Sequence, residues 1–421
     1  MTDPNKALAT SIEEKLGHLP SLSADCCIYK VPENLRCMNE AAYRPLIVSI
    51  GPFYHKDERL RPMEEHKLRY LSTFKTCSVN NRALEDYIKI IREKEVKVRQ
   101  QYMQNFELNS DEFTEMVMVD SVFIIELFRR LTDPTLIEEN DPLFGKPQMI
   151  DDVNRDLQLL ENQLPIFILE IVYNSAFSGS SFSSITCKFF NVKEVEVQNF
   201  KHFVDLLRFY YLPSSLRSSP TLRSSPNHET KFCTPVSATY LYSAGVKFVP
   251  YTDKSLLDIK FDRGSLKIPP LNLEDWTEPF FRNLMIFEQY YYLLDSYIID
   301  YIVFLGFLIK TPNDVDILVQ CGVIKNWLGN NEEVLNFFNT IVKHVRMLNS
   351  RFYYSDVCNK LDKYYNDGWN QNKAILKQKY FKHPWAAASV IYAVVILILT
   401  LGQAATGVTS NIQAGCNKHS G

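Results

Sequence analysis

A long uncharged stretch near the end of the chain constrains the fold most strongly. No Asp, Glu, Lys or Arg occurs from Pro384 to Asn417, and residues 385–408 are almost all apolar or small. A helix needs about 20 mostly apolar residues to cross a bilayer, so we predict a transmembrane helix over 385–408. The residues expected to form this membrane anchor are Trp385, Val390, Ile391, Val394, Val395, Ile396, Leu397, Ile398, Leu399 and Leu401. A buried C-terminal helix is the alternative, but core helices usually carry a polar face.

The charges that flank this stretch predict its orientation. Lys373, Lys377, Lys379 and Lys382 precede it, whereas only Lys418 follows it. Because cytoplasmic flanks carry an excess of Lys and Arg, we expect the body of the protein in the cytosol. A short tail, residues 409–421, would then lie across the membrane.

The remainder of the chain has the composition of a globular protein. Hydrophobic residues make up 46% and charged residues 23%, and the net charge is −3. This balance argues against nucleic-acid binding, which normally requires a basic surface. Residues 1–24 are predicted to be a loose N-terminal segment, and no apolar run of a secretory signal peptide is visible there. Residues 25–380 are expected to form the body.

Helical periodicity dominates the body, so the predicted fold class is mainly α (α+β). Apolar residues recur at helical spacing in most of the body's segments. Pro165 should kink or break one of the predicted helices, since proline removes a backbone donor. We expect helices from Pro62 onward, over 81–106, from Ser110 to Leu131, and over 151–173, 195–213, 280–309 and 331–348.

Two further stretches have distinct interpretations. Residues 256–273 alternate between apolar and polar around Arg263-Gly264, a pattern that predicts a β-hairpin. Residues 297–309 are apolar enough to rival the C-terminal span, but they are short and include Asp300. A carboxylate is expensive in lipid, so this stretch is interpreted as a core helix.

Residues 214–235 form one low-complexity segment, rich in Ser and Pro. The tetrapeptide Arg-Ser-Ser-Pro occurs twice in it, which makes Ser219 and Ser225 candidate sites of proline-directed phosphorylation. A solvated loop of turn residues is the simpler interpretation of the same composition.

The chain lacks the local motifs of common enzyme classes. Phosphate-binding glycine loops, the metalloprotease His-Glu-x-x-His motif and the Gly-x-Ser-x-Gly elbow do not occur. The nine cysteines are irregularly spaced, which is typical of reduced thiols. We therefore expect no cofactor and no metal. The remaining acid–base candidates are interpreted as helix starts or solvated faces: Glu64-Glu65, Glu138-Glu139, Asp151-Asp152, His55 with Asp57, and His202 with Asp205.

Several blocks of the chain together resemble a plant family known as domain of unknown function 247. They include IYKVPENLRCMNEAAYRPLIVSIGPFYH (28–55), DLQLLENQLPIFIL (156–169), ATYLYSAGVKFVP (238–250) and YFKHPWAAASVIYAVVILILTLGQ (380–403). The resemblance extends from about Asp25 to Gln403 with the blocks in the order of the family. It implies a plant-specific, membrane-anchored protein without an accepted enzymatic activity. Some grass members are implicated as male-side determinants of self-incompatibility.

No catalytic role is implied by the resemblance for residues 160–165. We expect Glu161 or Asn162 to bond buried backbone next to Pro165. The function expected from the whole sequence is recognition or signalling by a non-enzymatic protein, anchored in membrane lipid and bound to an unidentified protein partner through its helical body. The alternatives are an enzyme whose active site is assembled from scattered residues, and a structural membrane tether.

Overall fold

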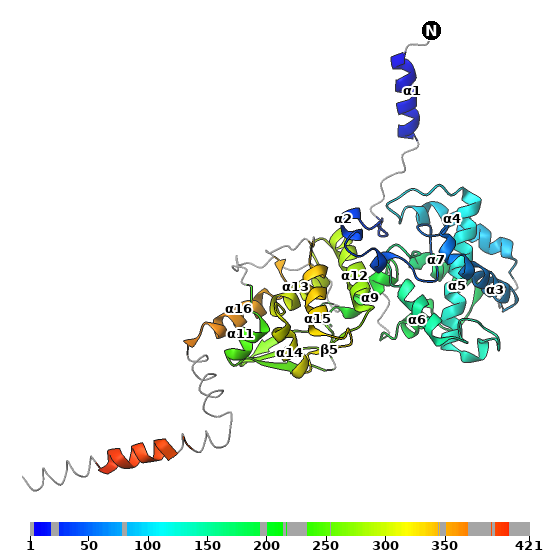
Figure 1. The fold of residues 1–421 in the computed structure, drawn as a ribbon. Helices are drawn as coiled ribbons and strands as arrows, with labels where there is room; N and C mark the ends of the chain where they lie inside the picture. Colours follow the sequence, from blue (N-terminus) through cyan, green and yellow to red (C-terminus); the bar gives the residue numbers. More distant parts are fainter. Residues whose placement is uncertain are drawn as a thin grey trace, which may run out of the picture.

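The computed structural model is mainly helical with a small β component, as predicted (Figure 1). Helix α1 (Pro4–Gly17) lies within the N-terminal segment for which the sequence predicts a loose chain. The structure describes residues 4–17, 25–77, 82–193, 200–213, 216, 234–252, 254–343, 345, 351–368, 389 and 392–403.

The N-terminal part of the body is built around one long helix, α5 (Ser110–Thr132), which is buried along most of its length. Helices α3, α4, α7 and α8 pack against it. The other elements of this part are α2 (Glu33–Arg36), η1 (Glu40–Tyr43), η2 (Glu58–Leu60), α3 (Arg61–Cys77), α4 (Leu84–Arg99), η3 (Pro134–Leu136), α6 (Pro147–Asp156), α7 (Ile166–Ala176) and α8 (Phe182–Phe189).

Helix α5 begins where local signals predict. The side chain of Asn109 accepts hydrogen bonds from the backbone N–H groups of Asp111 and Glu112, both at 2.9 Å. Glu112 in turn accepts from the N–H of Asn109 at 2.9 Å, which completes a capping box. The acidic residues of the first turn also favour the positive end of the helix dipole. The predicted start at Ser110 is thus confirmed.

The predicted helix over 151–173 is interrupted, and this is the most consequential difference from the sequence prediction. Helix α6 ends at Asp156 and α7 begins at Ile166, after Pro165 as its N-cap. The intervening residues 157–165 form a buried loop. Its leucines pack into the core although the loop is not helical, and the polar residues Glu161, Asn162 and Gln163 are buried as well.

The polar side chains at this connection bond the backbone of residues 46–50, an irregular segment. Asp156 accepts from the N–H groups of Leu46, Ile47 and Val48 at 2.7–2.9 Å. Asn162 accepts from the N–H of Ile50 at 2.7 Å and donates to the carbonyl of Val48 at 3.1 Å. The prediction that Asn162 bonds buried backbone is confirmed.

Glu161 ties the same loop to the beginning of the body. It accepts from the N–H of Val31 at 2.6 Å and from the hydroxyl of Tyr54 at 2.5 Å. It also pairs with Arg36. One buried carboxylate therefore fixes three points of the segment 31–54, and the prediction for Glu161 is confirmed too.

Gly51 lies where this segment approaches the loop most closely. Its φ is +73°, and a Cβ at this position would lie 2.6 Å from the carbonyl oxygen of Gln163. The N–H of Gly51 donates to Asp120 of α5 at 2.8 Å. Asp120 also pairs with the fully buried Lys67 at 2.6 Å. Only glycine satisfies both the left-handed backbone and the close contact.

The C-terminal part of the body contains two small sheets among helices. In the first sheet β3 lies between β1, to which it is parallel, and β2, to which it is antiparallel. The second sheet pairs β4 with β5 in parallel. The elements are α9 (Phe203–Tyr211), α11 (Ala238–Ser243), β1 (Lys247–Pro250), β2 (Lys260–Asp262), β3 (Ser265–Ile268), β4 (Leu271–Leu273), α12 (Thr277–Tyr291), α13 (Tyr297–Leu308), α14 (Pro312–Gln320), β5 (Ile324–Asn326), α15 (Asn331–Ile341) and α16 (Ser355–Tyr365).

The predicted hairpin is confirmed, and the helical stretch predicted over 280–309 forms two helices, α12 and α13. Strands β2 and β3 are joined by Arg263 and Gly264, both with positive φ. The chain turns between α12 and α13, where Glu288 of α12 accepts from the N–H groups of Ile298 and Ile299 at 2.9 and 3.0 Å. Helix α13 is a core helix, as predicted, and its buried Asp300 accepts from the N–H of Tyr353 at 2.7 Å.

The predicted C-terminal membrane span is described only in part. Residues 392–403 are helical, and no helix among the described residues is long and apolar enough to cross a membrane. Three predicted anchor residues, Trp385, Val390 and Ile391, lie outside the described residues, as do the candidate phosphosites Ser219 and Ser225.

His202 caps helix α9 from a fully buried position. Its Nδ1 accepts from the N–H of Asp205 at 3.3 Å, so its Nε2 donates to the carbonyl of Cys27 at 3.1 Å. Burial lowers the pKa of His202 to about 4, although the nearby Asp205 carboxylate raises it. The imidazole is therefore neutral in the folded protein near neutral pH.

We predict that Gly51→Ala lowers the free energy of unfolding by about 2–4 kcal/mol, from backbone strain and the contact with Gln163 together. Denaturant unfolding of the full-length protein in a mild detergent measures the loss. Gly322→Ala is the matched control, because Gly322 has nearly the same φ, +74°, but a Cβ added there would make only an ordinary contact, 3.8 Å from Cγ of Pro250. Equal losses in the two variants would contradict a role for the Gln163 contact.

We also predict an acid-dependent loss of stability that His202 causes. Its pKa is lower in the folded state than the ordinary value of 6.5. Above pH 6.5 the imidazole is neutral in both the folded and the unfolded chain, so it does not lower the free energy of unfolding there. As the pH falls from 6.5 to 4, protonation favours the unfolded chain by about 3 kcal/mol in total. His202→Asn keeps a capping side chain that does not titrate. Parallel stability–pH profiles for the two proteins would refute this assignment.

Candidate functional site

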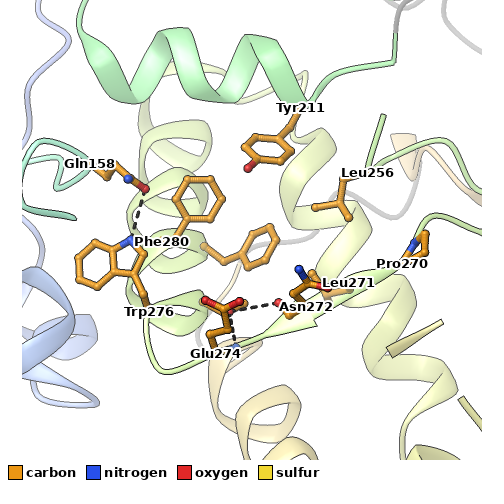
Figure 2. A pocket seen from close by; sticks show the side chains of 11 residues that line it. Gln158, Tyr211, Leu256, Pro270, Leu271, Asn272, Glu274, Trp276 and Phe280 are labelled. Carbon is orange, nitrogen blue, oxygen red and sulfur yellow. Dashed lines mark hydrogen bonds between the residues drawn. The ribbon is translucent and has the colours of Figure 1, made fainter. Parts of the chain in front are cut away.

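A pocket of about 310 Å³ lies where the N-terminal and C-terminal parts of the body meet (Figure 2). It is within the size range of ligand pockets in proteins. Its walls come from the loop that follows α6, the end of α9, strand β4 and the beginning of α12. The lining residues are Gln158, Tyr211, Leu256, Pro270, Leu271, Asn272, Glu274, Trp276, Thr277, Phe280 and Phe281.

Four of the eleven lining residues are aromatic: Tyr211, Trp276, Phe280 and Phe281. The rings of Tyr211 and Phe280 meet edge to face with centroids 5.3 Å apart, and Phe280 meets Phe281 at the same distance. The indole Nε1 of Trp276 donates to the side-chain oxygen of Gln158 at 3.3 Å. In Figure 2, Tyr211 lies at the top of the view and Trp276 lies at the left, beneath Gln158. The aromatic groups are therefore held by one another and by the loop after α6.

A turn between β4 and α12 places the polar groups at the rim. The hydroxyl of Thr277 accepts from the N–H of Glu274 at 2.8 Å and donates to the carbonyl of Asn272 at 3.3 Å. These bonds use the backbone of Glu274 and Asn272 but leave their side chains exposed. Glu274 is the one ionisable carboxylate among the described residues that line the pocket.

Two phenol groups belong to this region: Tyr211 lines the pocket, and Tyr301 packs against the lining residue Phe281 with ring centroids 6.1 Å apart. Burial raises the pKa of Tyr211 to about 12, so its hydroxyl stays protonated at neutral pH. Tyr301 is fully buried, and its hydroxyl has no hydrogen-bond partner among the described residues. Burial raises the pKa of Tyr301 as well, and the proximity of Tyr211 adds to this shift. An orphan hydroxyl is costly in a protein interior, so the buried hydroxyl of Tyr301 is a feature that packing alone does not explain.

A second, more open hollow of about 640 Å³ contains one of the sequence candidates, His55 with Asp57. Arg59 donates to the carboxylate of Asp57 from Nε at 3.0 Å. This pair lowers the pKa of Asp57 to about 2. Because basic and acidic side chains alternate around this hollow, it has no single charge for a ligand to recognise.

Of the other acid–base candidates, His202 and Asp205 lie together, but as the cap of α9, and one residue of each acidic pair bonds a residue outside the pair. Glu64 pairs with Lys67 at 2.7 Å, Glu138 accepts from Thr73 at 2.9 Å, and Asp152 lies 3.7 Å from Arg155. Within the described part of the chain, no group of three or more His, Cys, Asp or Glu side chains could hold a metal ion. Cys26, Cys27, Cys37 and Cys321 are free cysteines among the described residues.

Sequence reasoning missed the pocket residues altogether. The run Glu274-Asp275-Trp276-Thr277-Glu278 precedes an apolar stretch, and acidic residues there are typical of a helix start. Trp276, which lies among these acidic residues, is the one local feature of the sequence that could have indicated a site. Tyr211 and Gln158 are distant in the chain and carry no local sign of a site.

Comparisons with known proteins place the chain in a family. It is 31% identical to the UPF0481 protein At3g47200 of Arabidopsis thaliana, over 91% of this chain and 87% of that protein. It is 22% identical to the putative UPF0481 protein At3g02645 of the same plant, over 88% of each chain. No solved structure matches it with significance. The family model DUF247, described as "Plant protein of unknown function", matches residues 28–399. As the resemblance of its sequence blocks predicts, the chain belongs to the DUF247 family of plant proteins.

Proposed function

We propose that this protein is a membrane-anchored recognition protein whose helical body binds another protein through the aromatic pocket. The observation that carries this proposal is the composition of the pocket: aromatic side chains in its walls and polar groups at its rim. Aromatic residues in desolvated pockets dominate the energetics of protein–protein binding, and polar rims supply specificity. The pocket has the features of such an anchoring site.

The use of buried charges supports a role without catalysis. The most deeply buried ionisable groups complete hydrogen bonds of the fold: Asp156 bonds three backbone N–H groups, and Asp120 pairs with Lys67. Glu288 pairs with Arg208 and bonds the first turn of α13. Among the described residues that line the pocket, no nucleophile lies beside a histidine or lysine that could act as its base. We therefore propose that the protein is not an enzyme.

The C-terminal helical residues support membrane attachment. The side chains of Val394, Val395, Ile396, Leu397, Ile398, Leu399 and Leu401 are between 44% and 62% exposed. A continuous apolar surface of this kind is rare in water and marks a contact with lipid or protein. The uncharged stretch of the sequence extends beyond this helix on both sides, which favours lipid. The lysines before the stretch favour a cytosolic body.

The membrane proposal predicts the behaviour of a truncated chain and of glycosylation probes. Deletion of residues 385–421 should move the protein from the membrane fraction to the soluble fraction. An acceptor site placed after Val408 should be glycosylated in microsomes, whereas one placed near Ser219 should not. Glycosylation near Ser219 alone would show that the body lies on the side of the membrane opposite to the cytosol. Glycosylation at neither site, with unchanged fractionation of the truncated chain, would contradict the anchor.

The recognition proposal predicts that one tryptophan is required for partner capture. We expect in-cell crosslinking of the full-length plant protein to yield a discrete adduct that Trp276→Ala reduces by about tenfold or more, the usual effect of removing an interface anchor. Trp327→Ala is the matched control, because Trp327 is 71% exposed and does not line the pocket. An adduct that both variants retain, or no adduct in the wild-type protein, would refute the proposed role of the pocket.

A further inference from the structure

We propose that the pocket binds a cationic side chain of the partner, and that this side chain is an arginine. This inference rests on the proposed recognition function and specifies what the pocket recognises. The observation behind it is an arrangement of an arginine, an aromatic ring and a carboxylate that recurs in the body of the protein. The pocket contains the ring and the carboxylate of this arrangement.

Inside the body, guanidinium groups lie over aromatic rings while a carboxylate bonds them from the side. Arg208 lies 3.7 Å from the ring centroid of Tyr292 and pairs with Glu288 at 2.8 Å. Arg99 lies 3.9 Å from the ring of Phe113 and pairs with Glu95 at 2.8 Å. Two further examples combine Arg130, Tyr70 and Asp141, and Arg129, Phe177 and Glu126. Cation–π attraction and a charge-assisted hydrogen bond act together in each of them.

The described residues that line the pocket include the aromatic rings and the carboxylate of this arrangement but no cation. The rings are those of Trp276 and Phe280, and the carboxylate is that of Glu274. Arg155, which does not line the pocket, lies 5.8 Å from the ring centroid of Trp276, farther than the arginines of the four interior examples lie from their rings. The nearby cations have acidic partners of their own. Arg282 pairs with Glu278 at 2.7 Å, and Arg155 lies 3.7 Å from Asp152. The carboxylate of Glu274 therefore remains available to a ligand.

The other polar groups favour a guanidinium over an ammonium. A guanidinium has five N–H donors in a planar fork, whereas an ammonium is a compact charge with three donors. The hydroxyl of Tyr211 and the amide oxygen of Asn272 can accept hydrogen bonds, as can the carboxylate of Glu274. In Figure 2, Tyr211 lies across the pocket from Asn272 and Glu274. Acceptors on two sides of the pocket suit a planar donor with several N–H groups.

The test compares two probes that differ mainly in charge. N-acetyl-arginine methylamide carries the guanidinium, and N-acetyl-citrulline methylamide replaces it with a neutral urea of the same shape. The full-length protein, in a non-ionic detergent, is labelled with 5-fluorotryptophan, and fluorine NMR follows its four tryptophans. The Trp276 signal is assigned by its loss in Trp276→Phe. We expect the arginine probe to shift this signal with a dissociation constant about tenfold lower than that of the citrulline probe.

Three variants locate the source of the preference. Glu274→Gln should abolish the preference for arginine over citrulline, because it removes the charge but keeps the side-chain shape. Tyr211→Phe should weaken the binding of arginine by about threefold, the usual effect of one lost hydrogen bond. Glu115→Gln is the control for charge, since Glu115 is exposed on α5 outside the pocket, and it should change neither affinity.

Three outcomes would overturn the inference. The first is equal affinity for the two probes, and the second is no shift of the Trp276 signal up to the solubility limit of the arginine probe. The third is a shift of the Trp276 signal that the disaccharide cellobiose produces and the arginine probe does not. The last outcome would identify the pocket as a sugar site. The proposed function is judged separately by crosslinking. A Trp276-dependent adduct without arginine binding refutes only the ligand assignment, whereas an adduct independent of Trp276 refutes the recognition role.

Discussion

The fold depends on the buried polar side chains of residues 156–163, because they bond a segment of backbone that has no strand partner. Residues 46–51 cross the core as irregular chain, and their N–H groups end on Asp156, Asn162 and Asp120. A buried N–H group without an acceptor costs about 1–3 kcal/mol. Several such groups together would cancel a large part of the free energy of unfolding of a domain. The helices of the body pack around a connection that side chains, and not a sheet, hold together.

The elements that the sequence predicts well are those whose signals are local. Helix α5 is recognisable because Asn109 and Glu112, three positions apart, form its cap. The hairpin is recognisable because Arg263 and Gly264 adopt positive φ between alternating strands. Helix α14 carries an equally local signal, a capping box from Thr311 to Asp314 with Pro312 at its start, although apolar periodicity alone does not reveal so short a helix. Where neighbours in sequence determine the structure, local patterns are sufficient to predict it.

The loop after α6 and the pocket could not be predicted, because distant residues determine them. Leu157, Leu160 and Leu164 have helical spacing, yet the chain leaves the helix at Asp156. The break in the helix is stabilised by hydrogen bonds to backbone groups more than 100 residues earlier in the chain, and no local sequence pattern indicates them. Likewise Gln158, Tyr211 and Trp276 meet only in the folded protein. The prediction of Pro165 as a breaker was correct, but proline could not indicate how long the interruption is.

The same connection that organises the fold also fixes the shape of the pocket. Gln158 belongs to the loop after α6, accepts the indole N–H of Trp276 and is itself bonded to Asn154 at 3.0 Å. Two residues later, the N–H of Leu160 donates to Asn283 of α12, the helix that carries Phe280 and Phe281. The aromatic walls are therefore held in place before any ligand arrives. A preorganised site loses less conformational freedom on binding, so more of the contact energy remains as affinity. In this molecule the connection whose hydrogen bonds hold residues 46–50 thus also holds the walls of the pocket.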